Sequence, residues 1–155
     1  MDADGDYADC TDDTQMSERE KYPLKELTEK IIGAAYEVHN TLGGGFVEKV
    51  YENALIEELR EHGFIIEQQK PVSVLYKGKS AGEFIADMIV EKKVLVEVKS
   101  VKMLTKDFDS KLIHYLKATG IEVGLLINFG ESVQVHRKIY TPKQKQSVNK
   151  SAQSE

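Results

Sequence analysis

Residues 80–99 read S-A-G-E-F-I-A-D-M-I-V-E-K-K-V-L-V-E-V-K. β-Branched and aliphatic residues flank a charged break at 91–93. Such a pattern predicts two strands, 82–90 and 94–99, joined by a short turn. The predicted core of the domain is therefore a β-hairpin.

The second strand of this hairpin carries charge on one face only. Side chains alternate between the two faces of a strand, so Glu97 and Lys99 lie on the face opposite three valines. Asp87 interrupts the preceding apolar strand, and the hairpin brings it toward Glu97. Buried charge is costly unless it is paired or bound to a cation. These residues therefore need a structural or chemical explanation.

Two interpretations of these charges follow from the residues alone. In the first, Asp87 and Glu97 supply hard oxygen ligands for Mg²⁺, and Lys99 orients a nucleophilic water or offsets developing negative charge. In the second, Glu97 and Lys99 form an edge-strand ion pair and Asp87 lies at a strand end. The spacing by itself leaves both open, because short motifs recur by chance.

Length and composition indicate a single globular domain. The chain has 155 residues, of which 41% are hydrophobic and 30% charged, enough to bury a core without disulfides. The single cysteine, Cys10, cannot form an intrachain disulfide. No apolar run approaches the ~20 residues that span a bilayer, and the acidic N-terminus has no signal-peptide pattern. We expect a cytoplasmic protein with no membrane association.

The net charge of −5 is concentrated at one end of the chain. Residues 1–20 hold eight acidic side chains and one arginine, so the rest is nearly neutral and slightly basic. Residues 1–22 are therefore predicted to be a disordered acidic tail, and 141–155 a disordered polar and basic tail. The predicted domain spans 23–140, and its charge neither favours nor excludes nucleic acid.

The remaining elements follow from apolar periodicity and turn residues. Helices are predicted from residue 24 to the glycines at 43–45, over 47–62 and over 106–119; strands over 72–76, 123–129 and 133–139 join the two of the central hairpin. The predicted order is α-α-β-β-β-α-β-β, an α+β (α/β) domain with one mixed sheet flanked by helices.

Glu48 falls within the apolar arc of the second helix, beside Tyr51, when the helix is placed on a wheel. It either brings a third carboxylate to a metal site or is satisfied by the dipole at the helix N-terminus. Gly43, Gly44 and Gly45 precede this helix, and we favour a helix cap and turn over a phosphate cradle, because no G-K-[ST] follows.

Six motifs in order resemble the GxxExxY protein family of the PD-(D/E)XK nuclease-like superfamily. They are G-F-V-E-K-V-Y at 45–51, Y-K-G-K at 76–79, D-M-I-V at 87–90, E-V-K at 97–99, Y-L-K-A-T-G at 115–120 and G-L-L-I-N-F-G at 124–130. The resemblance covers about residues 24–140. It implies a restriction-endonuclease-like core with the D…E-x-K motif on the central hairpin.

The resemblance also implies roles for individual residues. The expected catalytic set is Glu48, Asp87, Glu97 and Lys99. Asp87, Glu97 and the Val98 carbonyl would ligate Mg²⁺ or Mn²⁺, with Glu48 binding the metal directly or through water, and Lys99 would position the attacking water.

One position departs from the family pattern. Lys111 stands where the third-helix motif Q-L-L-x-Y-L has glutamine, and a lysine there could contact phosphate. Tyr51 and Tyr115 are further candidates for substrate contacts, although aromatic residues at helical spacing more often belong to a core.

The expected function is Mg²⁺-dependent hydrolysis of phosphodiester bonds in DNA or RNA. The alternatives are a non-catalytic nucleic-acid-binding or regulatory module and a purely structural interaction domain. With no separate recognition domain, sequence specificity would come from a homodimer partner or from substrate structure.

Overall fold

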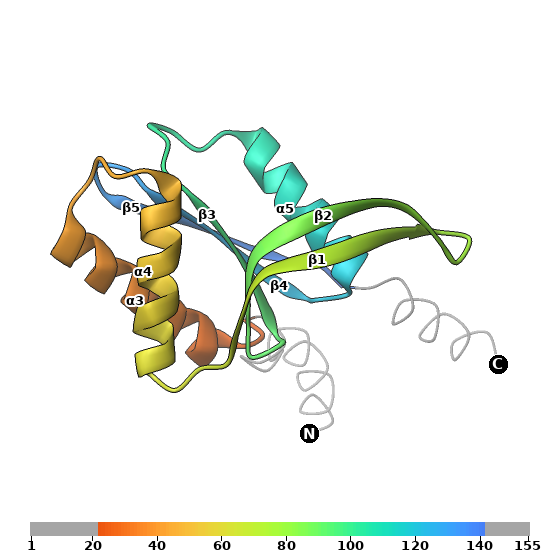
Figure 1. Cartoon of the computed structure of the whole chain (residues 1–155), viewed down its shortest axis with the longest axis horizontal. Coiled ribbons are helices and arrows are strands. Elements are labelled where there is room, and N and C mark those ends of the chain that lie inside the picture. The colour runs from red at the N-terminus through yellow and green to blue at the C-terminus, as the bar shows by residue number, and fades with distance from the viewer. Residues whose placement is uncertain (1–21, 142–155) are drawn as a thin grey trace, which may run out of the picture.

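A five-stranded mixed sheet with helices on both faces forms the folded part of the chain, in a computed structural model that describes residues 22–141 (Figure 1). The predicted tails, 1–22 and 141–155, lie outside the described residues except for one residue each. Within this described part, no helix is long and apolar enough to cross a bilayer.

The elements follow the predicted order. They are α3 (Lys25–Leu42), α4 (Glu48–Glu61), β1 (Ile66–Tyr76), β2 (Lys79–Val90), β3 (Val94–Lys99), α5 (Lys106–Thr119), β4 (Val123–Phe129) and β5 (Val133–Ile139). The sheet order is β1-β2-β3-β4-β5, with β3 and β4 parallel and the other neighbours antiparallel. The α+β class with a mixed sheet flanked by helices is thereby confirmed.

The first two strands are longer than predicted. β1 begins at Ile66 rather than at residue 72, and β2 begins at Lys79 rather than at residue 82. The start of β1, I-E-Q-Q-K-P, is polar and contains Pro71, which is typical of a loop. An edge strand tolerates a proline because one side of it lacks a ladder partner.

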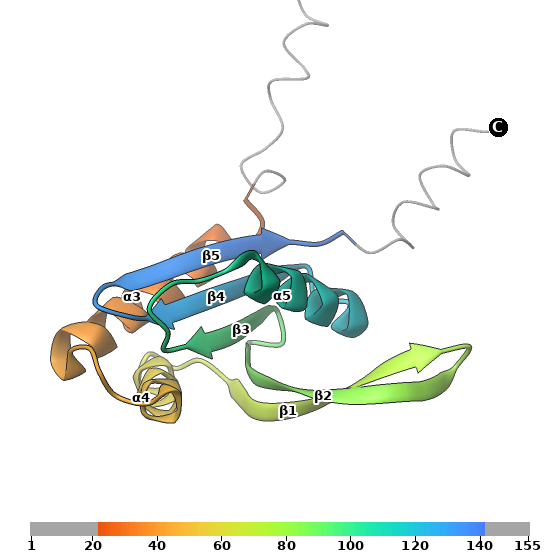
Figure 2. The same cartoon turned by 90° about the horizontal axis from the view of Figure 1, so that it is seen from above.

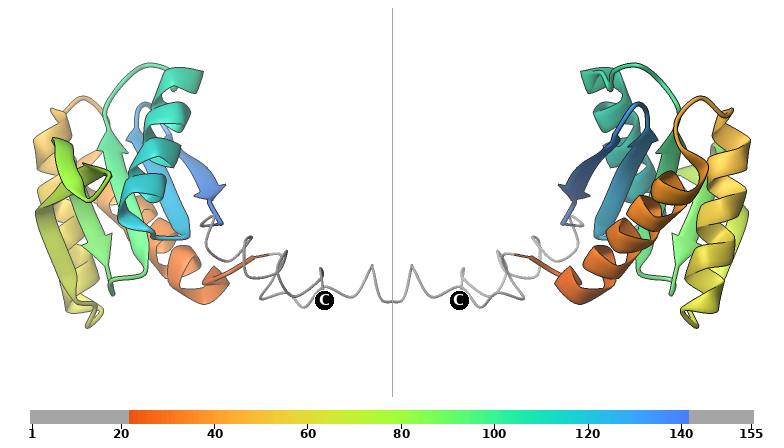
Figure 3. Two further views of the ribbon diagram at one scale, coloured as in Figure 1. Left: turned by 90° about the vertical axis from the view of Figure 1, so that its right-hand side faces the viewer. Right: turned by 90° about the vertical axis from the view of Figure 1, so that its left-hand side faces the viewer.

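Two apolar layers enclose the sheet. On one face, α3 and α4 pack against β2–β5 through residues such as Ile31, Leu55 and Ile127. On the other face, α5 packs Leu112 and Leu116 against the central strands. Figure 3 shows α3 and α4 on one side of the sheet and α5 on the other. All of β4 is buried, as its continuous apolar run predicted.

The hairpin of β1 and β2 extends beyond the rest of the sheet (Figure 2). β2 pairs with β1 along most of its length but with β3 only from Met88 to Val90. The two-residue turn at Lys77 and Gly78 has positive φ at both positions, the backbone that tight hairpins favour. The outer part of this hairpin therefore has no partner among the other three strands of the sheet.

Gly124 marks the tightest contact between α5 and the sheet. A Cβ at this position would lie 3.0 Å from Leu112 Cδ1 and 3.1 Å from Leu116 Cδ2. We expect Gly124→Ala to lower the free energy of unfolding by about 1–3 kcal/mol through overpacking. Gly33→Ala is the matched control, because nothing lies within 4 Å of a Cβ there and helix propensity favours alanine by up to ~1 kcal/mol.

Urea unfolding of both variants measures this difference. Equal stability of Gly124→Ala and wild type would contradict the close packing of α5 on β4.

Candidate active site

The backbone pairing of β2 with β3 ends next to Asp87. There, hydrogen bonds to two side-chain carboxylates replace backbone–backbone hydrogen bonds between the strands. The last β2–β3 pair is Met88 with Val96. Beyond it, the Asp87 backbone N–H donates to Glu97 Oε1 at 3.1 Å, and the Val98 N–H donates to Asp87 Oδ2 at 2.9 Å. Each carboxylate thus accepts a hydrogen bond from a backbone N–H of the opposite strand. We call this arrangement the strand fork, comprising Asp87, Glu97 and Val98.

Both carboxylates of the strand fork have raised pKa values. Glu97 is only 7% exposed. Its burial, and then the charge of Asp87, raise the pKa of Glu97 to about 8. Burial, followed by the charges of Glu52 and Glu48, raises the pKa of Asp87 to about 6, despite the hydrogen bond from Val98. Ionising both groups is therefore unfavourable, and a nearby cation would relieve the cost.

Helix α4 brings two further carboxylates toward the strand fork. Glu48, in its first turn, is partly exposed, and its Oε1 lies 3.8 Å from Lys99 Nζ. Glu52, one turn later, is buried, with an exposed fraction of 3%. Lys99 pairs with Glu48 and also lowers the pKa of Glu97. Side chains from α4, β2 and β3 thus form one group, which we call the charged cluster: Glu48, Glu52, Asp87, Glu97 and Lys99.

Glu52 is held by side-chain amides of β1. Its Oε1 accepts a hydrogen bond from Gln69 Nε2 at 2.7 Å, and its Oε2 accepts one from Gln68 Nε2 at 3.2 Å. Lys49 pairs with the same carboxylate. Neither Glu52 nor the two glutamines were predicted from the sequence, although Glu52 lies one helical turn from Glu48 on the same side of α4.

The backbone of β1 is irregular beside the strand fork. Gln69 has φ 51°, a left-handed conformation that costs a non-glycine residue about 1–3 kcal/mol. The β1–β2 register pairs Gln68 with Met88 and Lys70 with Ala86, with no pair recorded at Gln69 and Asp87 between them. The ladders on both sides of β2 are thus interrupted at the level of Asp87.

Helix α5 borders the cluster on the other side. Tyr115 stacks on Phe84 of β2, with ring centroids 3.9 Å apart. Burial and then the charge of Glu97 raise the pKa of Tyr115. Lys99 Nζ lies 5.4 Å from the ring centroid of Phe108. Lys111 is exposed and shares this face of α5, being three residues from Phe108 and four from Tyr115.

Tyr51 has a structural position rather than the substrate contact predicted for it. Its side chain is fully buried and stacks on Phe129 with centroids 4.7 Å apart. Its hydroxyl donates to the Gly43 carbonyl at 2.6 Å and accepts from the Phe46 N–H at 3.2 Å. Because Tyr51 has no exposed surface, it instead fixes the loop that leads into Glu48.

The glycine loop caps a helix, as predicted. Gly43, with φ 72°, ends α3 and donates its N–H to the His39 carbonyl. Gly44 passes close to the turn between β4 and β5, where an added Cβ would lie 3.1 Å from the Gly130 oxygen. Beside this loop, an open depression of about 950 Å³ adjoins Glu48 and includes Ser100 and Lys102. A ligand approaching Glu48 can enter through this depression.

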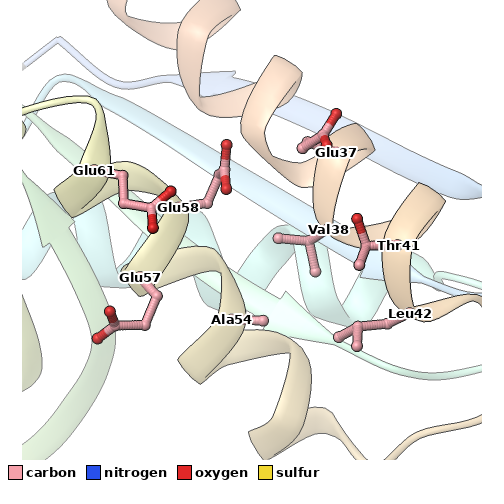
Figure 4. Close-up of a pocket in the computed structure, with 8 residues that line it drawn as sticks. All are labelled: Glu37, Val38, Thr41, Leu42, Ala54, Glu57, Glu58 and Glu61. Carbon is pink, nitrogen blue, oxygen red and sulfur yellow. The ribbon is translucent and has the colours of Figure 1, made fainter.

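A second depression lies between α3 and α4 and contains none of the residues of the charged cluster. It has a volume of about 230 Å³ and four glutamates around it, as Figure 4 shows: Glu37, Glu57, Glu58 and Glu61. Among the described residues, no cationic side chain lines it. It is separate from the candidate active site.

The donor groups near the strand fork are oxygens, which suits Mg²⁺ or Mn²⁺ rather than a soft metal. Among residues 22–141, no three His, Cys, Asp or Glu side chains are grouped closely enough to hold a metal by themselves. Glu48 and Glu52 are each engaged by a lysine. A cation at the strand fork would therefore rely on Asp87, Glu97, backbone carbonyl and water.

Comparison with known proteins places the whole fold in one superfamily. A family model described as the PD-(D/E)XK nuclease superfamily matches residues 25–139. The crystal structure of SSO0001 has a similar fold, with a TM-score of 0.51 and 18% sequence identity over 81% of this chain. This chain spans 63% of the length of that protein. No curated protein matches the sequence significantly.

Proposed function

The chain belongs to the PD-(D/E)XK nuclease superfamily, and from this premise we propose that it is a divalent-metal-dependent nuclease that hydrolyses phosphodiester bonds. The strand fork is the observation that carries the proposal. Two largely buried carboxylates with raised pKa values lie beside Lys99, an arrangement that a cation and an anionic substrate together would satisfy. Within the superfamily, the six ordered motifs support membership of the GxxExxY family.

We assign the metal ligands to the strand fork. Asp87, Glu97 and the Val98 carbonyl would hold Mg²⁺ or Mn²⁺, and Glu48 would bind it directly or through water. Such a metal would act as a Lewis acid that lowers the pKa of bound water and neutralises phosphate charge. The short link from Asp87 to the Val98 amide, 2.9 Å, fixes the carboxylate before any ligand binds. Preorganised ligands of this kind reduce the cost of reorganisation during the reaction.

The remaining charged residues act on the phosphate and the attacking water. Lys99 orients the water and stabilises the negative charge that develops on the phosphate oxygens. Its ammonium is held between Glu48 and the Phe108 ring, so its position is restricted. Lys111 and Tyr115, on the same face of α5, contact the nucleic acid beside the scissile bond.

A non-catalytic nucleic-acid-binding module is the second candidate. Lys111 favours it, because a lysine replaces the glutamine of the family motif and adds a phosphate contact without adding chemistry. Such a module would bind nucleic acid at the same surface and leave it intact.

Cleavage of end-labelled single- and double-stranded DNA and RNA tests the proposal. We expect wild type to cleave at least one substrate with Mg²⁺ or Mn²⁺ and to stop when EDTA is added. Asp87→Asn retains an acceptor for the Val98 N–H and is expected to lose roughly 100-fold or more in rate. Asp107→Asn, an exposed acidic residue on α5, is the matched control and should cleave normally.

Tight binding of these substrates without cleavage would instead favour the binding module. Equal cleavage by wild type and Asp87→Asn would contradict the assignment of the active site to the strand fork.

A further inference from the structure

The outer part of the β1–β2 hairpin, residues 70–85, projects from the sheet, and we call it the β-arm (Figures 1 and 2). Its inner end lies at the strand fork, where Gln69 and Asp87 interrupt the ladders. Phe84 stacks on Tyr115 and supports this inner end on α5. The β-arm is therefore attached directly to the candidate active site.

The β-arm presents an unusual amount of apolar surface to solvent. Every residue from 73 to 83 is exposed, and the exposed fractions of Leu75 and Tyr76 are 66% and 65%. Val74 and Ile85 are also largely exposed. Beyond Phe84, the strands of the β-arm pair only with each other, and an isolated two-stranded hairpin is at best marginally stable in water. Exposed apolar residues grouped in this way usually mark a binding surface. The β-arm thus has the properties of an element that is completed by a partner.

The charge at the tip of the β-arm identifies the kind of partner. Lys77 lies in the turn and Lys79 directly follows it, and Lys77 Nζ lies 5.3 Å from the ring centroid of Tyr76. Glu83 is the one acidic residue among 70–85. Lysines of this kind contact the phosphates of a nucleic acid. An exposed aromatic ring beside them can contact base edges and thymine methyl groups.

We propose that the β-arm lies in the major groove of duplex DNA and thereby positions the phosphodiester backbone of the DNA over the strand fork. This inference rests on the proposed function and specifies its substrate as a DNA duplex. The major groove of B-DNA is about 12 Å wide and admits a two-stranded ribbon, whereas the deep, narrow major groove of duplex RNA does not.

The reach of the β-arm is consistent with such a complex. Lys77 lies eight residue steps beyond Gln69, which at about 3.3 Å per step gives at most roughly 26 Å. One turn of B-DNA is about 34 Å. The tip therefore contacts the same duplex within one turn of the bond that lies over the strand fork.

A second copy of this chain is the competing occupant of the β-arm. Association of two arms through their tips would bring the Lys77 and Lys79 pairs of both copies together, and like charges oppose this. Phosphates neutralise the same lysines. Charge complementarity therefore favours DNA.

Fluorescence anisotropy of a labelled DNA duplex, in EDTA and with the full chain, tests the inference without requiring cleavage. The arm variant combines Tyr76→Ala, Lys77→Ala and Lys79→Ala, all at exposed positions. We expect its affinity to fall about tenfold, and the slope of log K against log salt to decrease by about 2 for the two lost phosphate contacts. Calorimetric Mn²⁺ binding, measured separately without EDTA, should remain unchanged, because the strand fork is intact.

A charge-matched control separates local contact from net charge. Lys92→Ala with Lys93→Ala removes the same two charges from the turn between β2 and β3, at the opposite end of β2. This control should bind DNA as wild type does. Circular dichroism of both variants confirms that they are folded.

Several results would overturn the inference. They are failure of wild type to bind duplex DNA, equal affinity of the arm variant and wild type, equal loss in the control, and arm-dependent binding of duplex RNA as tight as that of DNA. A homodimer in sedimentation that the arm variant dissociates would assign the β-arm to a second copy. Arm-dependent DNA binding without any metal-dependent cleavage would uphold the β-arm and reject the nuclease.

Discussion

Replacing Lys99 with methionine is expected to slow metal-dependent cleavage by roughly 100- to 1,000-fold. Lys99 is the cation that lies between Glu48, at 3.8 Å, and the Phe108 ring, at 5.4 Å. Methionine keeps much of the aliphatic stem that packs there but cannot orient water or offset charge on the phosphate. Because Lys99 is not a metal ligand in our assignment, Mn²⁺ affinity should be retained.

Lys102→Met is the matched control for this variant. Lys102 is exposed three residues further along the chain, at the depression beside Glu48. Its loss should change cleavage only through weaker substrate binding, so the maximal rate at saturating substrate stays close to that of wild type. Unchanged cleavage by Lys99→Met would contradict the assigned role, and so would a loss of Mn²⁺ binding.

Replacing Glu97 with glutamine is expected to stabilise the metal-free protein at pH 8 while abolishing its cleavage activity. The amide oxygen of the introduced glutamine can still accept the Asp87 N–H, but the substitution removes a charge buried beside Asp87. Replacing unfavourable buried charge commonly raises stability by about 1–4 kcal/mol. The activity is lost because glutamine is a poor ligand for a divalent cation compared with glutamate.

The pH dependence of this stabilisation has a definite sign. The pKa of Glu97 is raised in the folded state from 4.5 to about 8. The folded protein therefore binds this proton more tightly than the unfolded chain. The contribution of protonated Glu97 to stability is fully present below pH 4.5 and is lost as the pH rises toward 8. Glu97→Gln should match wild type near pH 4.5 and exceed it increasingly up to about pH 8.

Thermal unfolding in EDTA at several pH values measures this difference. Asp107→Asn is a suitable control, because it removes a carboxylate that is exposed on α5. If Glu97→Gln were less stable than wild type at pH 8, the expectation would be contradicted. The protein itself would then offset the cost of the buried Glu97 charge without a metal.

The sequence predicted the fold well wherever periodicity and turn residues agreed. β3, α5, β4 and β5 have the bounds expected from their apolar patterns, and Gly120 and Gly130 follow the ends of α5 and β4. β1 was underestimated because the residues from Ile66 to Pro71 form an edge strand, where polar residues and proline are tolerated. Residues 66–71 form a strand because they pair with β2, and the local sequence does not reveal this pairing.

Part of the candidate site could be found from the sequence and part could not. The face of β3 that holds Glu97 and Lys99 follows from simple alternation. Glu52 could have been recognised, since on a helical wheel it falls between the buried residues Leu59 and Ile56. The hydrogen bonds within the strand fork and the left-handed backbone of Gln69 could not be predicted, because they arise where β2 leaves β3 and depend on contacts distant in sequence.

Calorimetric titration of Mn²⁺ into metal-free wild type and Glu97→Gln tests the central claim most directly, since it requires no knowledge of the substrate. We predict that wild type binds Mn²⁺ and that Glu97→Gln does not, with Mg²⁺ binding at the same place more weakly. Absence of binding by wild type, even with duplex DNA present, would contradict a metal-dependent active site at the strand fork.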